Sequence, residues 1–181
     1  GRYHLYVSYA CPWAHRTVMA RTLLGLEGHV SVDVVDWRMN ADGSWSFNPD
    51  EPGATPDRIN GEHHLEAVYR RAYPEWTNEG RVGTVPVLWD KMTGTIVNNE
   101  SRDIIRMFGT LATALGATTT LCPKHLVEAI DAMITANYES VNNGVYKSGF
   151  ARSQDAYEAA VTALFDRLDE LDSHLEDREW L

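Results

Sequence analysis

The stretch YHLYVS at residues 3–8, followed directly by YACPWAHR at residues 9–16, determines how this chain begins to fold. The first string is rich in aromatic and β-branched residues, as a strand is. Pro12 suits the first position of a helix, where its missing N–H costs nothing. We therefore predict a strand followed by a helix that begins at Pro12 and ends near Gly25. Cys11 then lies at a helix N-terminus, where unpaired N–H groups and the helix dipole favour a reactive thiolate over a thiol.

Cys11 has no cysteine partner nearby. A dithiol redox motif would have a second cysteine at position 14, which is Ala14. Cys11 is therefore either a buried structural cysteine or a nucleophile that works with a thiol from outside the chain. The other cysteine, Cys122, precedes a proline and is expected to be structural. Two cysteines do not make a disulfide framework, which fits a reducing cytoplasm.

Length and composition limit the number of domains and the class of protein. A chain of 181 residues holds one large domain or two small ones, and 44% hydrophobic with 23% charged residues is ordinary for a soluble globular protein. The net charge of −10 argues against a nucleic-acid binder, which normally has a basic face. No apolar run approaches membrane-spanning length and no signal peptide is visible. Both ends look cut, so we expect a fragment.

The first part of the chain has an α/β pattern. A short β-branched strand over 30–35 completes a strand–helix–strand unit. Residues 37–83 then form a long insertion with a short helix near 62–72, and three tryptophans suggest that it is ordered. Strands over 85–90 and 95–97 follow, and a helix begins near Ser101.

The second part of the chain is all-α. Residues 110–122 look like a linker, which divides a domain over 1–109 from an incomplete helical domain over 123–181. Apolar residues at helical spacing form two stripes, which predict a bundle core. The stripes are Leu126, Ile130, Met133, Ile134 and Tyr138, and then Tyr157, Val161, Leu164, Leu168, Leu171 and Leu175.

Four motifs in order carry a resemblance that runs across nearly the whole chain. They are YACPWAHR at 9–16, TVPVLWD at 84–90, IVNNES at 96–101 and NNGVYK at 142–147. In these four motifs the chain resembles the xi-class glutathione transferases, the glutathionyl-hydroquinone reductases. The resemblance implies a glutathione-transferase fold, with a thioredoxin-like N-terminal domain followed by a helical C-terminal domain.

The resemblance implies that Cys11 is the nucleophile. Its thiolate would attack the sulfur of a glutathionyl group on a hydroquinone, and a second glutathione would release Cys11 as oxidised glutathione forms. Glutathione is then a co-substrate, although another low-molecular-weight thiol remains open, and no metal is implied. A homodimer in the cytoplasm is the further implication. His15 shares the face of Cys11, but a polar surface histidine is the preferred interpretation.

The predicted thiol-binding residues lie at two places, the start of a strand and the start of a helix. Val85 and Pro86 form an X–Pro bond, the usual site of a cis peptide. In a thioredoxin-like domain, such a bond leaves the Val85 backbone free to pair with a peptide ligand beside Cys11. Glu100 and Ser101 open a helix, so Ser101 and the backbone N–H groups suit a carboxylate while Glu100 suits an α-ammonium. Simple helix capping would explain both residues as well.

Three further residues follow from the resemblance. Trp45, in GSWSF at 43–47, matches the tryptophan that contacts glutathione in the family. Arg81 matches an arginine that suits a glycyl carboxylate, although RVGTV at 81–85 has one residue more than the usual pattern. Tyr146 lies in the helical-domain motif that faces the aromatic substrate; a core tyrosine is the alternative.

The alternatives are a metal site, an omega-like thioltransferase and a non-catalytic module. His63 and His64 lack the spacing and companion ligands of a metal site. An omega-like thioltransferase that acts on dehydroascorbate or mixed disulfides remains open, but the motif at 142–147 favours the xi class. A non-catalytic module that binds proteins is the alternative from another class, and an inert Cys11 would support it.

Overall fold

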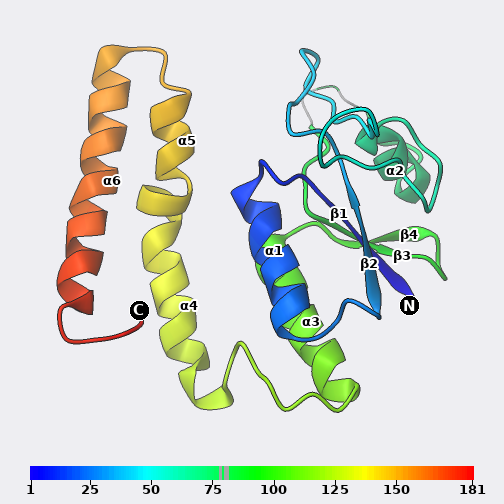
Figure 1. Cartoon of the computed structure of the whole chain (residues 1–181). Coiled ribbons are helices and arrows are strands. Elements are labelled where there is room, and N and C mark those ends of the chain that lie inside the picture. Colours follow the sequence, from blue (N-terminus) through cyan, green and yellow to red (C-terminus); the bar gives the residue numbers. More distant parts are fainter. Residues whose placement is uncertain (78, 80–81) are drawn as a thin grey trace. The chain divides into compact units, whose positions relative to one another are not determined.

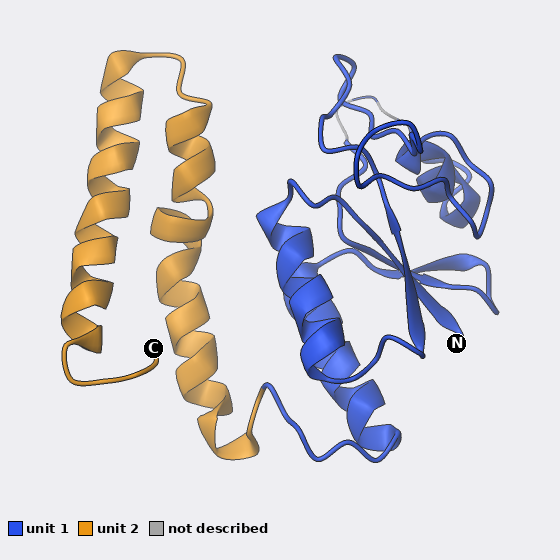
Figure 2. Ribbon diagram, in the orientation of Figure 1, with its two compact units in different colours: residues 1–121 blue, residues 122–181 orange. Residues whose placement is uncertain are grey.

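The structure is a computed structural model of the chain, and it describes residues 1–77, 79 and 82–181. The chain divides into two compact units, Gly1–Leu121 and Cys122–Leu181, which Figure 2 shows in different colours. The boundary falls at the end of the segment expected to be a linker.

A mixed sheet of four strands forms the centre of the first unit, in the order β2-β1-β3-β4 (Figure 1). The strands are β1 (Tyr3–Val7), β2 (Val30–Val34), β3 (Val87–Asp90) and β4 (Thr95–Asn98). β1 runs parallel to β2 and antiparallel to β3, and β3 runs antiparallel to β4. β1 therefore lies inside the sheet, and four of its five residues are buried.

Helices α1 (Pro12–Leu23) and α3 (Ser101–Ala114) lie side by side in the first unit and contact each other (Figure 1). In α3, Ile104, Phe108 and Ala112 recur at every fourth position and are buried, so one stripe of the helix enters the core. The remaining helix of this unit, α2 (Leu65–Ala72), lies in the insertion and contacts β4.

Two element boundaries differ from the sequence expectation. β3 begins at Val87 and not at residue 85, because Pro86 has no N–H to donate to a ladder. α3 continues to Ala114 and so occupies part of the segment expected to be a linker. Its last turns are rich in leucine and alanine, which favour helix, and Ala112 is buried.

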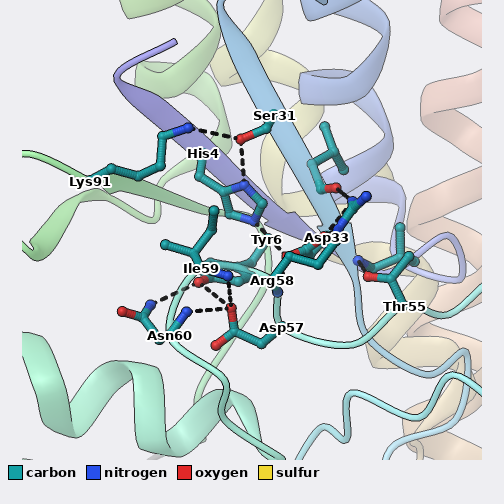
Figure 3. A network of polar contacts seen from close by, with 12 residues as sticks. His4, Tyr6, Ser31, Asp33, Thr55, Asp57, Arg58, Ile59, Asn60 and Lys91 are labelled. Atoms are coloured by element: carbon teal, nitrogen blue, oxygen red, sulfur yellow. Dashed lines mark hydrogen bonds and ion pairs between the residues drawn. The ribbon is translucent and has the colours of Figure 1, made fainter.

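The insertion is anchored to the sheet through its segment 55–60 (Figure 3). The Tyr6 hydroxyl donates to Asp57 at 2.9 Å and accepts a hydrogen bond from the Asn60 amide at 2.9 Å. Asp57 also accepts the backbone N–H groups of Ile59 and Asn60, each at 3.0 Å. A hydroxyl on the central strand therefore fixes a loop whose own backbone is held by one carboxylate.

A second anchor joins the same loop to β2. The backbone N–H of Arg58 donates to Asp33 at 2.8 Å, and its guanidinium donates to the same carboxylate. His4 Nε2 lies 3.3 Å from Asp33 Oδ2, while His4 Nδ1 lies 2.7 Å from the Ser31 hydroxyl. Lys91 reaches the same hydroxyl at 3.3 Å (Figure 3). Polar side chains of β1 and β2 thus attach the insertion to the sheet.

The second unit is entirely helical in its described elements. They are the 3₁₀ turn η1 (Lys124–Leu126), α4 (Val127–Asn137), the π-helical turn η2 (Tyr138–Asn142), α5 (Gly144–Gly149) and α6 (Gln154–Leu175). The expectation that the two apolar stripes are a buried core is wrong for this unit. No residue of α4 or α6 is buried, although α6 contacts α5 and α4 contacts η2.

Among the residues that the structure describes, no helix combines the length and the apolar character needed to cross a membrane.

Candidate active site

Cys11 is the N-cap residue of α1, with Pro12 in the first turn, so its predicted position at a helix start is confirmed. The tight exit from β1 is held by two contacts of Ser8. Its carbonyl accepts the Cys11 N–H at 3.1 Å, and its hydroxyl donates to the carbonyl of Asp36 at 3.1 Å. Cys11 is a free thiol of intermediate exposure. The strand-to-helix turn therefore presents a reachable sulfur.

The sulfur of Cys11 faces Val85, the residue before the cis proline. Sγ lies 3.6 Å from the carbonyl oxygen of Val85, and the Val85–Pro86 bond is cis, as expected. Both residues are buried. Among the described residues, the N–H of Val85 has no hydrogen-bond partner. A backbone donor next to the sulfur is what a peptide-like thiol would pair with.

The segment before Val85 is tied to the helical side of the site through Thr84. Its carbonyl accepts the Tyr69 hydroxyl at 2.8 Å, and its hydroxyl accepts the Asn99 amide at 3.3 Å. The Asn99 amide also donates to the Tyr69 hydroxyl at 3.2 Å. Because Asn99 directly precedes Glu100, these bonds hold the backbone beside Cys11 in register with the start of α3.

Glu100 and Ser101 open α3, as the sequence predicts. The Glu100 carboxylate accepts the N–H of Arg102 at 3.1 Å, and the Glu100 N–H donates to Asn98 at 2.6 Å. The side chain of Glu100 is half exposed, whereas Ser101 is only 3% exposed. The carboxylate can therefore cap its own helix and still meet a cation from solvent. Capping and ligand binding do not exclude each other here.

Arg16 is part of this arrangement, although the sequence reasoning did not single it out. Its guanidinium donates to the Ser101 hydroxyl from Nε at 2.9 Å and from Nη2 at 2.7 Å. It also lies 4.8 Å from the centre of the Trp13 ring. Arg16 lies in the motif quoted at 9–16, but five positions turn an α-helix by about 140°, so the local spacing does not place it on the face of Cys11. The tie between α1 and α3 required the tertiary structure.

Trp45 is 9% exposed and lies in the insertion. Its carbonyl accepts the N–H of Leu65 at 3.0 Å, and the neighbouring Ser46 forms a bridge with His64. The indole N–H makes no hydrogen bond to any described residue. A Cβ on Gly43 would meet the Val82 side chain, so the loop before Trp45 approaches the segment that leads to Val85.

A buried carboxyl lies behind this segment. Glu66, in the first turn of α2, is 2% exposed, and neither carboxyl oxygen has a hydrogen-bond partner in the described part of the chain. Burial raises the pKa of Glu66. A Cβ on Gly83 would lie 3.3 Å from this carboxyl and 3.2 Å from the Tyr69 ring. A side chain at position 83 would crowd both, which gives the glycine a packing reason.

Two further site residues were expected from the sequence, Arg81 and Tyr146. Arg81 lies outside the residues that the structure describes. Tyr146 lies in the second unit, half-buried, with its ring 6.3 Å from that of Phe150 in α5. Beside it, Lys147 and Asn143 both contact the Glu139 carboxylate and lower its pKa.

The structure also bears on the two roles considered for histidines, His15 beside Cys11 and a metal site at His63 and His64. His15 is exposed, and its backbone N–H donates to the Cys11 carbonyl at 2.9 Å. Within the described ranges, no three histidine, cysteine, aspartate or glutamate side chains gather as a metal site would require.

Comparison with known proteins agrees with this geometry. Residues 10–111 match the family described as glutathione S-transferase, N-terminal domain. That match contains Cys11, Val85, Pro86, Glu100 and Ser101. The chain is 48% identical to the glutathionyl-hydroquinone reductase PcpF of Sphingobium chlorophenolicum, covering 100% of the chain and 56% of that protein. It is 45% identical to the glutathione S-transferase omega-like 2 of Schizosaccharomyces pombe, covering 97% of the chain and 56% of that protein.

Solved structures give the same result. The glutathione S-transferase Xi of Phanerochaete chrysosporium superposes with a TM-score of 0.93 at 50% identity, over 100% of this chain and 61% of that one. The glutathione-bound structure of YqjG from Escherichia coli K-12 gives a TM-score of 0.93 at 48% identity, over 99% of this chain and 57% of that one. The expected fold class is confirmed. The chain spans little more than half the length of the relatives that it matches.

Proposed function

Because the chain belongs to the glutathione S-transferase family, we propose that it carries the thiol-binding half of a glutathionyl-hydroquinone reductase, with Cys11 as the nucleophile. The observation that carries the proposal is the position of Cys11, a free thiol at the start of α1, 3.6 Å from the Val85 carbonyl. The similarity to the reductase PcpF over the whole chain supports the substrate class.

The first step is the reduction of the conjugate. The Cys11 thiolate attacks the sulfur of a glutathionyl group, and a sulfur–sulfur bond forms as the bond between that sulfur and the ring carbon breaks. The electron pair of the broken bond goes to the ring carbon, which takes a proton and leaves as hydroquinone. Cys11 remains joined to glutathione as a mixed disulfide.

The second step restores the enzyme. The thiolate of a second glutathione attacks the glutathionyl sulfur of the mixed disulfide, and Cys11 leaves as a thiolate. The product is oxidised glutathione, so two electrons pass from two glutathione sulfurs to the ring. This step explains why the position at Ala14 needs no cysteine: the ligand supplies the resolving thiol.

The proposed seat for glutathione uses the residues around Cys11. Val85 would pair with the cysteinyl backbone, and Pro86 holds that segment in its cis form. Ser101 and the N–H groups of α3 would receive the γ-glutamyl carboxylate, and Glu100 its α-ammonium. Trp45 offers an indole N–H that no described residue occupies. Arg81 for the glycyl carboxylate and Tyr146 for a quinol oxygen are further proposals that rest on the family resemblance.

An omega-like thioltransferase is the second candidate, since a relative at 45% identity bears an omega-like name. Both candidates need Cys11 and glutathione, and they differ in the electrophile that reaches the sulfur. The reductase cleaves a carbon–sulfur bond, whereas the thioltransferase cleaves a disulfide or reduces dehydroascorbate. The use of another low-molecular-weight thiol, a homodimer and a cytoplasmic setting belong to the same proposal.

The test is turnover of glutathionyl-hydroquinone with glutathione, alongside dehydroascorbate and a glutathionylated peptide. We expect release of free hydroquinone and of oxidised glutathione in equal amounts. Trapping after one turnover without free glutathione should give a chain whose mass is raised by one glutathione on Cys11. Turnover of the peptide alone would favour the thioltransferase, and no adduct with any substrate would support the non-catalytic module.

A further inference from the structure

The hydroxyl of Ser101 is held by Arg16 from the neighbouring helix. The guanidinium donates from Nε at 2.9 Å and from Nη2 at 2.7 Å to the same oxygen. A serine oxygen has two lone pairs and one O–H. Both lone pairs of the Ser101 oxygen accept N–H groups of Arg16. The hydroxyl can therefore form a further hydrogen bond only by donating its O–H.

The Ser101 O–H has no short hydrogen bond to an acceptor among the residues that the structure describes. The acceptor that its O–H meets, Glu100 Oε1, lies at 3.4 Å, beyond the usual range for an O–H donor. An outside carboxylate at the start of α3 would therefore gain a hydrogen bond that the free protein does not complete. Ser101 is 3% exposed, so little water reaches its hydroxyl in the free protein.

Arg16 also fixes the charge at this helix start. Its guanidinium stacks over the Trp13 ring at 4.8 Å and lies 3.5 Å from Glu100 Oε1. Its side chain is 28% exposed, so its charge is near the surface and close to the α3 N-terminus. The helix dipole, the Ser101 O–H and the guanidinium all favour an anion at the same place.

We infer that Arg16 is a positioning residue that acts through Ser101 and makes this site selective for thiols that carry a γ-glutamyl carboxylate. The inference rests on the proposed function, since it names a determinant of the same seat. Arg16 belongs to α1, the helix that Cys11 caps, so one helix both presents the sulfur and orients the carboxylate receptor on α3.

The competing explanation is that Arg16 only joins α1 to α3. The two roles differ in ligand selectivity. A structural tie would weaken every ligand alike, whereas a positioning role would weaken only ligands that have the γ-glutamyl carboxylate. Cysteinylglycine is glutathione without its γ-glutamyl group, so the two thiols provide the comparison.

The experiment measures binding of S-methylglutathione and S-methylcysteinylglycine by calorimetry, which needs no turnover. For Arg16→Gln we expect S-methylglutathione to bind about tenfold more weakly, the scale of one hydrogen bond to a charged group. S-methylcysteinylglycine should change by less than about twofold. Arg16→Lys should recover part of the loss, since it restores the charge without the double donation. The double variant with Ser101→Ala and Arg16→Gln should bind S-methylglutathione only slightly more weakly than either single variant.

Arg21→Gln is the matched control on the same helix. Arg21 donates to the backbone carbonyls of Val30 at 2.6 Å and Glu27 at 3.2 Å, so its loss should lower thermal stability without changing selectivity. Equal weakening of both ligands by Arg16→Gln, or no weakening, would overturn the inference, as would wild-type protein that does not prefer S-methylglutathione. Wild-type binding with this preference but without hydroquinone release would instead refute the proposed function.

Discussion

The sulfur of Cys11 lies 3.6 Å from the carbonyl oxygen of Val85, the residue before the cis proline. A thiol can donate to this carbonyl, whereas a thiolate cannot. Loss of the proton therefore removes the contact between the sulfur and the Val85 carbonyl. The carbonyl of Val85 then becomes available to a ligand, as does its N–H, which has no hydrogen-bond partner among the described residues.

Replacement of Cys11 tests the nucleophile directly. Cys11→Ser should abolish hydroquinone release and the glutathione adduct, because a serine hydroxyl forms no mixed disulfide. Cys122→Ser is the control, since Cys122 is the other free cysteine and lies in the second unit. Mass spectrometry of both variants after reaction with glutathionyl-hydroquinone gives the result. An adduct that persists in Cys11→Ser and vanishes in Cys122→Ser would refute the assignment.

Tyr69 should contribute to ligand binding through Thr84. Tyr69→Phe removes the hydrogen bond to the Thr84 carbonyl, which costs about 1 kcal/mol of unfolding free energy and loosens the backbone before Val85. We expect glutathione binding to weaken by about three- to tenfold in calorimetry. Tyr73→Phe is the control, because Tyr73 directly follows the same helix and its exposed hydroxyl has no partner among the described residues. Equal affinities in the two variants would contradict the proposed link.

Asp33 should stabilise the fold at neutral pH. Burial by itself would raise the pKa of Asp33, but the His4 ring and the hydrogen bonds from Arg58 outweigh burial and lower it. The unfolded chain then binds the proton more readily, so this stability is present above about pH 4 and is lost as the pH falls through the lowered pKa. Asp33→Asn should cost about 2 kcal/mol at pH 7.

Urea unfolding at several pH values checks the Asp33 prediction. The difference between wild type and Asp33→Asn should begin to shrink below about pH 4, where the unfolded chain takes up the proton, and continue to shrink as the pH falls through the lowered pKa of the folded carboxyl. Asp50→Asn, at an exposed position, should leave stability unchanged. A difference that stays constant from pH 7 to pH 3 would mean that Asp33 acts through shape and not through its charge.

Glu66 should have the opposite effect. Burial raises its pKa, so its contribution to stability is present below about pH 4, the ordinary range of a glutamate, and is lost as the pH rises through the raised pKa. Glu66→Met fills a similar volume without a charge and should stabilise the protein by about 1 kcal/mol at pH 8. Thermal unfolding at pH 4 and pH 8 measures this gain, with the exposed Glu75→Met as control. A loss of stability at pH 8 would show that the Glu66 carboxylate is needed.

Local patterns in the sequence were sufficient for much of the site. Pro12 after Cys11 predicted a helix start because proline suits the first turn, and the structure has that start. The Val85–Pro86 cis bond and the capping role of Glu100 follow in the same way from what one or two neighbouring residues allow. The helical stripes failed as a prediction of burial, because periodicity shows that a face is apolar and not what covers it.

The sequence by itself determined the elements, their order and the motifs, since helix starts, turns and strands depend on residues close together in the chain. Only the tertiary structure could bring Arg16 to Ser101, 85 positions along the chain, and Thr84 to Tyr69 and Asn99. Such contacts depend on how helices and strands pack, and no local spacing encodes them. The proposed nucleophile can therefore be predicted from a short motif, whereas the contact between Arg16 and Ser101 could be found only in the folded protein.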